Sequence, residues 1–459
     1  MRVMILGLDC VPPSVVFDRW AADLPHLNGL RQRGMWGPLR STRPPITVPA
    51  WACMASGADP GELGLYGFRN RTADRSYALR VANARDVRVK RLWDRLSDAG
   101  HRVASLFVPL TSPPTPVRGQ MVSCFLHADG PQSFPPRFLA GLEARFGAYM
   151  ADIPDFRTDD LERVFGDLHR MRDQHFAMAQ AVWQEQRPDF LMMVEMGPDR
   201  LHHAAWHHMD RLHPRYEAGN PWESRCHAYY VQLDARVGDM LDAAGDDTLV
   251  MVVSDHGARA MERAIAVNDV LRELDLLALA EAASEGASDG AAPLRDRVDW
   301  SRTTAWAEGG YYARLFLNVC GREPEGTVSI GSRQETLARV IEHLKEALAV
   351  RGVSLEADLP ERTYRATLGE PPDAMLYFDD LRARALGTVG HADWIVPTND
   401  HGPDGCNHDW NGIFIAAGPG VAAGKVEDLS ILDVAPTVLD AFGVEHSLHG
   451  RSRFRRSLG

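Results

Sequence analysis

The sequence has no surplus of basic residues, no long hydrophobic run and no closely paired cysteines. Lys and Arg number 50 against 62 Asp and Glu, a formal net charge of −12, whereas binders of nucleic-acid polymers usually carry a positive balance. No segment approaches the ~18–20 apolar residues that cross a bilayer. The six cysteines are scattered along the chain and contain no C-x-x-C motif. These absences argue against a nucleic-acid polymer or a membrane as partner.

The N-terminus also lacks the pattern of an export signal. Its apolar run, residues 3–8, is short and ends at Asp9, whereas a signal peptide needs a longer apolar region. We therefore expect residues 3–8 to form a buried strand. Scattered cysteines without an export signal predict free thiols in a reducing compartment, and hence a cytoplasmic protein.

Short apolar runs alternate with longer amphipathic segments along the 459 residues. This alternation predicts an α/β fold with a largely parallel sheet and crossover helices. The runs that predict strands are 3–8, 103–108, 190–196, 248–253, 315–319 and 413–417. The segments that predict helices are 89–99, 229–244, 334–350 and 433–442, and three of them end next to a glycine suited to a C-cap.

Composition divides the chain into five expected regions. Residues 1–126 and 187–275 are expected to build the α/β core, with a helical cap inserted at 127–186. Residues 276–298 include a stretch rich in Ala, Glu, Ser and Gly, which predicts a linker or mobile loop. Residues 299–459 are expected to complete the core and to add a subdomain.

Polar residues lie at the ends of several predicted strands. They are Asp9 after 3–8, Asp199 and His203 after 190–196, Asp255 and His256 after 248–253, and His401 and His408 before 413–417. Ligands of open parallel sheets bind at the carboxyl ends of the strands, so these side chains are expected to converge. Each also has an ordinary explanation when taken singly, such as a helix N-cap or a surface pair.

Three carboxylates and three histidines at one sheet edge favour a metal site over capping. These ligand types bind zinc, and two ions about 3.5–4 Å apart would clamp the attacking and leaving oxygens of a displacement at phosphorus. The candidate nucleophile is Thr47, whose proline-flanked segment predicts a helix with Thr47 at its N-cap. Its hydroxyl is either only a cap, or the group that attacks a phosphoryl group held by the helix amides.

Taken together, these motifs resemble the type I phosphodiesterase and nucleotide pyrophosphatase branch of the alkaline phosphatase superfamily. The resemblance covers most of the chain. It rests on Gly7-Leu8-Asp9, the T-x-P-A-W segment at 47–51, LWDRLSDAG at 92–100, DRLHHAAW at 199–206, LDARVG at 233–238, SDHG at 254–257, NVCGREPEG at 318–326, NHDWNGIFIAAGPG at 407–420 and DVAPTVLDAFG at 433–443. It implies an alkaline phosphatase-like three-layer α/β/α sandwich with a largely parallel central sheet and an inserted cap region.

The resemblance also implies two metal ions, expected to be Zn²⁺ with Mn²⁺ as the alternative. One ion would be held by Asp9, Thr47, Asp255 and His256, and the other by Asp199, His203 and a late histidine. His408 is preferred for the last position, because H-x-x-x-G directly before a predicted strand matches the closer relatives. His401 stays as the alternative, because His401-Gly402-Pro403-Asp404 is similar to a loop of the nucleotide pyrophosphatases.

The implied reaction is attack by Thr47 on phosphorus, followed by hydrolysis of the phosphothreonine by water. The expected substrate is a small phosphorylated, nucleotide-like metabolite with a phosphodiester or pyrophosphate bond, contacted by Arg69, Asn70 and Trp51. Because monoesterases of the superfamily commonly use an arginine there, a phosphomonoesterase is the first alternative. A sulfatase or phosphonate hydrolase and then a phosphomutase follow, and the oligomeric state is left open.

Overall fold

The computed structural model describes residues 1–74, 76–280, 292–397, 399 and 402–455. The chain forms two compact units. The first contains Met1–Phe68, Ala82–Ala258 and His408–Gly459, and the second contains Arg69–Val81 and Arg259–Asn407. The second unit is therefore built from two separate insertions into the sequence of the first.

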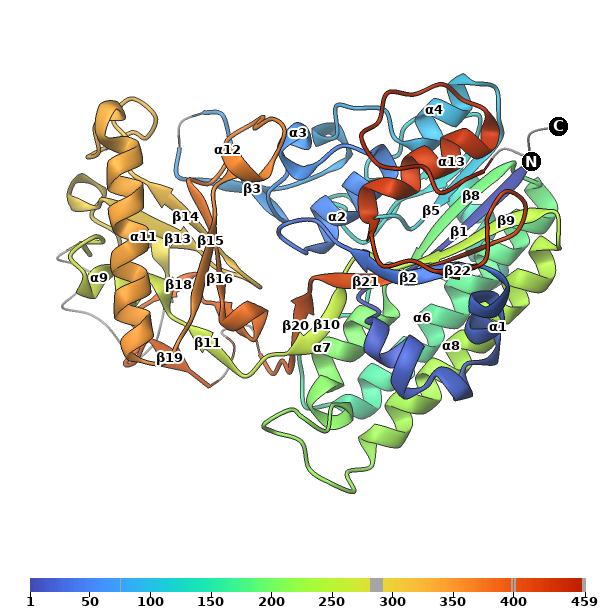
Figure 1. Ribbon diagram of the computed structural model, residues 1–459, viewed down its shortest axis with the longest axis horizontal. Helices are drawn as coiled ribbons and strands as arrows, with labels where there is room; N and C mark the ends of the chain where they lie inside the picture. Colours follow the sequence, from blue (N-terminus) through green and yellow to red (C-terminus); the bar gives the residue numbers. More distant parts are fainter. Residues whose placement is uncertain (75, 281–291, 398, 400–401, 456–459) are drawn as a thin grey trace. The chain divides into compact units, whose positions relative to one another are not determined.

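The first unit is organised around a ten-stranded sheet (Figure 1). Its strand order is β22-β2-β21-β9-β1-β8-β5-β6-β7, with β23 paired to β2. These strands are β1 Arg2–Leu8, β2 Met35–Arg40, β5 Val103–Leu106, β6 Gly119–Val122, β7 Ser133–Phe134, β8 Phe190–Glu195, β9 Thr248–Val253, β21 Asn411–Ala417, β22 Gly424–Lys425 and β23 Leu429–Ser430. The adjacent strands from β9 to β6 are parallel, and β21 runs antiparallel between β9 and β2.

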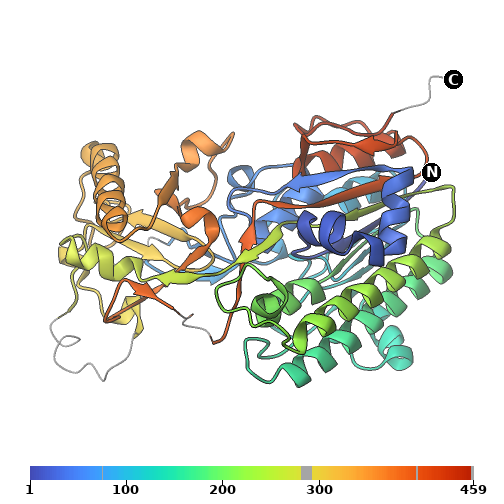
Figure 2. The same cartoon turned by 60° about the horizontal axis from the view of Figure 1, so that its bottom comes forward.

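Helices cover both faces of this sheet (Figures 1 and 2). One layer contains α1 Pro25–Arg33, α6 Leu161–Ala181, α7 Gly197–Met209 and α8 Trp222–Ala244, and the other contains α2 Thr47–Ser56, α4 Leu92–Asp98 and α13 Val434–Phe442. The central strands are apolar on both faces because both are covered: every residue of β8 and β9 is buried. The three-layer α/β/α arrangement and the largely parallel sheet expected from the sequence are confirmed.

The strand register brings three strand ends to one edge of the sheet. Leu8 of β1 pairs with Glu195 of β8, and Gly7 pairs with Val253 of β9. Residues that follow these strands therefore start at the same level. Gly7 also lets α2 approach β1, because a Cβ there would lie 2.5 Å from Cη2 of Trp51.

The second unit has a seven-stranded, mainly antiparallel sheet. Its strands are β11 Arg263–Ile265, β13 Ala305–Glu308, β14 Ala313–Leu317, β15 Leu355–Asp358, β16 Ala374–Phe378, β17 Ala383–Ala385 and β19 Ile395–Val396. Side chains of α9 Val267–Glu273 and α11 Arg333–Val350 share its hydrophobic core. The hairpin of β3 Arg69–Arg71 and β4 Leu79–Val81 and the pair of β12 Ala292–Pro293 and β18 Thr388–Val389 complete it.

Most predicted elements are present, with one difference in placement. The run 315–319 falls in β14, where both neighbours are antiparallel, so it does not belong to the parallel sheet. A fully apolar strand shows that it is buried but does not show in which sheet. Residues 127–186, expected as a cap, contain β7, α5 Phe138–Phe146 and α6 within the first unit. Part of the expected linker, 281–291, lies outside the described residues.

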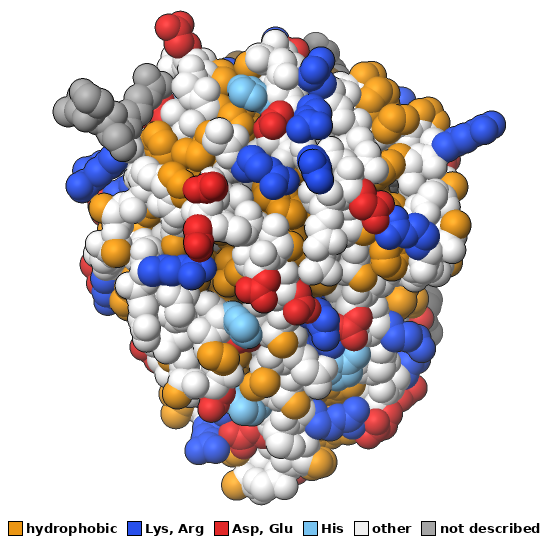
Figure 3. All heavy atoms as spheres, turned by 90° about the vertical axis from the view of Figure 1, so that its right-hand side faces the viewer, with side chains coloured by type: hydrophobic (Ala, Val, Ile, Leu, Met, Phe, Trp, Pro, Cys, Tyr) orange, Lys and Arg blue, Asp and Glu red, His pale blue; other side chains and the backbone are white. Residues whose placement is uncertain are grey.

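Two further features are the apolarity of the helices and the distribution of charge on the surface. None of the helices in the described part of the chain is long and apolar enough to cross a membrane. On the face drawn in Figure 3, basic and acidic side chains are interspersed, with hydrophobic side chains scattered between them.

Candidate active site

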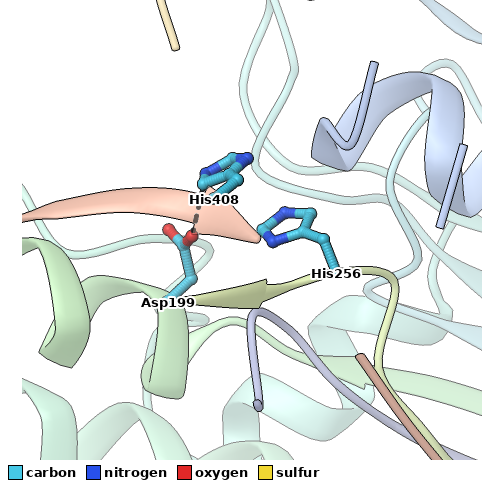
Figure 4. A group of neighbouring side chains, drawn as sticks. All are labelled: Asp199, His256 and His408. Atoms are coloured by element: carbon cyan, nitrogen blue, oxygen red, sulfur yellow. Dashed lines mark ion pairs between the residues drawn. The ribbon is translucent and has the colours of Figure 1, made fainter. Parts of the chain in front are cut away.

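Seven of the residues singled out in the sequence lie together in the first unit. All are buried, with at most 2% of the residue exposed. Asp9 follows β1, Asp199 and His203 lie one turn apart in α7, Asp255 and His256 follow β9, Thr47 starts α2, and His408 lies in β20 Cys406–Asp409, just before β21. The close-up in Figure 4 shows Asp199, His256 and His408 converging from three different elements.

The side chains form two adjacent groups around His256. In one, His256 Nε2 lies 3.1 Å from Thr47 Oγ1, 3.1 Å from Asp255 Oδ2 and 3.7 Å from Asp9 Oδ1. In the other, Asp199 Oδ1 lies 3.3 Å from His203 Nε2 and 3.7 Å from His408 Nε2. The rings of His256 and His408 stack with centroids 3.7 Å apart. The seven side chains therefore form two sets, which are in contact where the rings of His256 and His408 stack.

These separations fit the coordination of metal ions. Two ligands bound tetrahedrally at ~2.0–2.1 Å lie about 3.3 Å apart, close to the distances observed here. Three carboxylate oxygens, Asp9 Oδ1, Asp199 Oδ1 and Asp255 Oδ2, are buried without a hydrogen bond in the described part of the chain, which is costly unless a cation compensates for it. Ligand atoms of Asp9, Asp255 and His256, and those of Asp199, His256 and His408, also lie within 4.8 Å of one another.

The electrostatics of the carboxylates also favour a bound metal ion. Burial raises the pKa of Asp9 well above its usual range, and the charge of Asp199 raises it further. Burial likewise raises the pKa of Asp255, with Asp9 adding to the effect. Burial would also raise the pKa of Asp199, but the charges of His203 and Arg200 hold that pKa well below its usual range. A cation between Asp9 and Asp255 would remove their mutual repulsion.

The imidazoles are set up as neutral ligands. Burial lowers the pKa of His256 to about 4, and burial together with His256 lowers the pKa of His408 well below its usual range. The Nδ1 of His408 lies 2.9 Å from the carbonyl of Pro45, and that of His256 lies 3.1 Å from the carbonyl of Gly257. A carbonyl only accepts, so each Nδ1 carries the proton and each Nε2 presents a lone pair.

Thr47 occupies the first position of α2 rather than the predicted N-cap. The N-cap is Ile46, which has extended backbone angles and no capping side chain. The prediction failed because a hydroxyl after two prolines is typical of a cap, whereas here the Thr47 hydroxyl makes its contact with His256 instead. The helix start nevertheless brings its first-turn amides to the same place as the hydroxyl, as anion binding requires.

Trp51 has no exposed surface, so its ring offers no face to a substrate. Its indole N–H donates to Asp9 Oδ2 over 2.6 Å. This residue, predicted to contact the substrate, therefore supports Asp9 instead.

Other supporting residues escaped the sequence analysis. Cys10 has a positive φ of 64°, and its backbone N–H donates to Asp255 over 3.2 Å. Glu195 at the end of β8 contacts His175 Nδ1 at 2.8 Å and accepts from the N–H of Gly197. The only available signal was an acidic residue at a strand end, which gives no information about a partner twenty residues away.

Three other residues were predicted for the site. Arg69 and Asn70 belong to β3 of the second unit, and their role in holding substrate stays a prediction. His401 lies outside the described residues.

Comparisons with known proteins found a matching family model and similar solved structures. A family model described as type I phosphodiesterase / nucleotide pyrophosphatase matches residues 3–413. No curated protein sequence gives a significant match. Among solved structures, human ectonucleotide pyrophosphatase / phosphodiesterase 5 aligns with a TM-score of 0.56 at 13% identity, covering 98% of this chain and 97% of that one. Its murine counterpart, an inactive threonine-to-alanine variant in complex with AMP, aligns with a TM-score of 0.55 at 11% identity and the same coverage.

Proposed function

The chain belongs to the type I phosphodiesterase / nucleotide pyrophosphatase family, and from this premise we propose that it cleaves a small, nucleotide-like metabolite through a phosphothreonine at Thr47. Its family makes it a metal-dependent phosphoric ester hydrolase that acts on phosphodiester or pyrophosphate bonds. The observation that carries the finer proposal is the Thr47 hydroxyl, which lies at the start of α2 and 3.1 Å from His256 Nε2.

The metal would be held by the two groups described above, with Asp9, Thr47, Asp255 and His256 in one, and Asp199, His203 and His408 in the other. We propose two Zn²⁺, with Mn²⁺ as the alternative, because carboxylate and imidazole ligands suit both ions. Bound there, the ions would act as Lewis acids on phosphoryl oxygens and favour the ionised form of a hydroxyl.

The residues of the chain supply position and a nucleophile. The first-turn amides of α2 and the positive end of its dipole attract the phosphoryl oxygens. The Thr47 oxygen attacks phosphorus, and the leaving oxygen departs on the opposite side with its electron pair. Water then breaks the bond between phosphorus and the Thr47 oxygen, which restores the hydroxyl and releases the phosphorylated product.

The nucleotide-like character of the substrate rests on the murine relative, which holds AMP. AMP is one product of cleaving the pyrophosphate bond of an adenine nucleotide derivative. In that relative, an inactive form has alanine in place of a threonine, which supports a threonine in the reaction.

The test is a paired assay of metal-loaded protein on an aryl phosphate monoester and the matching aryl methyl phosphodiester, with metal content measured in the same samples. A higher kcat/KM for the diester is expected. A clear preference for the monoester would replace the proposal with a phosphomonoesterase.

Thr47→Ala is expected to lower turnover by at least about 10³-fold, as removal of a nucleophile does, while metal content stays near that of the wild type. Thr47→Ser is the matched control, because it keeps a hydroxyl. Mass spectrometry of acid-quenched protein should find a phosphoryl group on the peptide that contains Thr47. Turnover of Thr47→Ala near the wild-type rate would exclude this nucleophile.

A further inference from the structure

The second unit contains a cavity of its own, with a volume of about 560 Å³. This volume falls within the range of small-molecule sites, about 300–1,000 Å³. The walls come from four segments of the second unit: the β3–β4 hairpin, residues 293–295, the end of β13 with residues 309–310, and residues 384–388 in and after β17. None of the seven residues of the candidate active site lines it.

The cavity is lined by an excess of positive charge. Three arginines, Arg69, Arg295 and Arg384, face one acidic lining residue, Glu308. Arg295 approaches that glutamate at 3.6 Å, so Glu308 compensates at most part of the charge. The protein has a net charge of −12, whereas the charge that lines this cavity is positive. A positively charged lining attracts anions.

Arg384 is the most informative of the three. It is only 4% exposed, and its Nε and Nη1 make no hydrogen bond in the described part of the chain. Asp404 forms an ion pair with it at 3.7 Å from Nη1, and the ring of Tyr311 lies 5.3 Å from its Cζ, so part of the charge is compensated, but neither contact is a hydrogen bond to Nε or Nη1. A buried guanidinium with donors to spare is unfavourable unless a partner compensates for it.

The backbone of Arg69 is held in place within the second unit. Its carbonyl accepts a hydrogen bond from the buried Arg314, which fixes β3 against the sheet of the same unit. The residue itself is exposed. Arg69 therefore presents its charge at the outer part of the cavity, while Arg384 lies in the interior.

Apart from Thr388, the rest of the lining is apolar side chain or glycine backbone. Leu79, Val81 and Leu294 contribute apolar side chains, and Val81 is 49% exposed. A Cβ at Gly310 would meet no atom closer than 3.8 Å, so the chain leaves room there. An inorganic ion would fill only a small part of this volume.

We propose that this cavity binds a small organic anion, in which a phosphate or carboxylate group contacts the arginines and an apolar part lies against Leu79, Val81 and Leu294. Both groups are oxyanions of the kind that guanidinium groups bind by paired hydrogen bonds. The argument for this cavity does not depend on the reaction proposed for Thr47, because none of the seven residues of the candidate active site lines it.

The probes are 4-iodobenzoate and 4-iodophenylphosphonate, which share one apolar body and differ in the anionic group. Binding to the full-length, metal-loaded protein is measured by titration calorimetry. Crystals soaked with each compound are examined for the anomalous signal of iodine, which locates the bound ring. We expect at least one probe to bind with iodine in the cavity. Binding of only the benzoate or only the phosphonate supports the proposal and shows which anionic group the cavity prefers. Binding of neither compound overturns the proposal.

The position of the iodine separates binding in the cavity from binding of the phosphonate at the metal ions, and variants then test the arginines. Arg69→Glu is expected to weaken binding of the cavity ligand at least tenfold, and Arg384→Met by a similar factor. Because Arg384 is buried, Arg69→Glu on the exposed hairpin keeps the test valid if Arg384→Met fails to fold. Arg382→Gln is the matched control, because Arg382 is 59% exposed, pairs with Glu262 and does not line the cavity. Equal affinity in wild type and Arg69→Glu would overturn the proposal.

Discussion

Trp51 shows how one side chain supports the candidate site without contact with solvent. Its N–H donates to Asp9, and this hydrogen bond opposes the rise in the pKa of Asp9 that burial causes. The indole thus favours the charged form of Asp9, which a metal ion needs.

Trp51→Phe should therefore weaken metal binding by about 10–100-fold, the usual effect of losing a hydrogen bond to a metal ligand. The measurement is a competition titration with a chromophoric chelator. Trp183→Phe is the control, since Trp183 is also buried but donates to the carbonyl of Ala243. If both variants bind metal equally, the hydrogen bond to Asp9 has no such role.

The late histidine allows a second test at a single residue. His408→Ala is expected to lose about one of two bound ions, and millimolar imidazole should restore part of the metal content by filling the space left. His401→Ala should keep both ions. Equal losses in the two variants, measured by elemental analysis, would contradict the choice of His408.

At this scale the sequence was informative for residues next to strand ends. Four site residues could be predicted because the carboxyl ends of parallel strands lie at the same edge of a sheet: Asp9, Asp199, Asp255 and His256. Cys10 and Glu195 could not, because their contacts depend on a positive φ and on a partner in α6, neither of which follows from the local sequence.

Among the elements, α6 contains a titratable group whose effect on stability has a definite sign. His169 is half-buried, and its Nδ1 lies 3.0 Å from Nη1 of Arg172. Burial and then the charge of Arg172 lower the pKa of His169 below its usual value. The folded state therefore holds the proton less well than the unfolded state, so stability is lost as the pH falls below ~6.5.

His169→Gln should accordingly flatten the decline in unfolding free energy between pH 7 and pH 5. The measurement is urea unfolding at a series of pH values. His343→Gln on α11 is the control, because His343 is exposed. A pH profile of His169→Gln identical to that of the wild type would contradict the prediction.

The elements were predictable wherever the pattern was long or fully apolar. The strand at 248–253 coincides with β9, and the helix at 433–442 differs from α13 by one residue. The short strands β22 and β23 have only two residues each, too few for a periodicity. The strand at 315–319 was found, but its sheet was not, because pairing partners are set by tertiary contacts.

For the whole molecule, removal of metal is the informative perturbation. The raised pKa values of Asp9 and Asp255 mean that the metal-free folded state holds protons that the unfolded state releases. Metal-free stability therefore falls as the pH rises above ~3.8 through the folded pKa values. Metal ions bind the charged carboxylates, so the stabilisation of the folded state by bound metal should increase over the same pH range.

Chelation is thus expected to lower the Tm at pH 8 more than at pH 5.5. At a free metal concentration of 100 times Kd the stabilisation is about 2.7 kcal/mol. Differential scanning calorimetry with and without Zn²⁺ at both pH values is the measurement. If removal of the metal lowers the Tm by the same amount at pH 8 and pH 5.5, these carboxylates are not the ligands.

The division into two units was the least predictable feature. The sequence suggested a boundary near 276–298, whereas the compact units change at 258–259 and 407–408, with Arg69–Val81 joining the second unit. A hairpin that associates with a segment almost two hundred residues away carries no local signal for that association.

The order of the proposed ligands along the chain has a consequence for biosynthesis. The set starts at Asp9 and ends at His408, immediately after the second unit. A ribosome must therefore translate the whole second unit before the last ligand exists, and strand β21 follows only then. Nascent chains released early would lack both the last imidazole and a central strand of the sheet, so full metal loading should be a property of completed molecules.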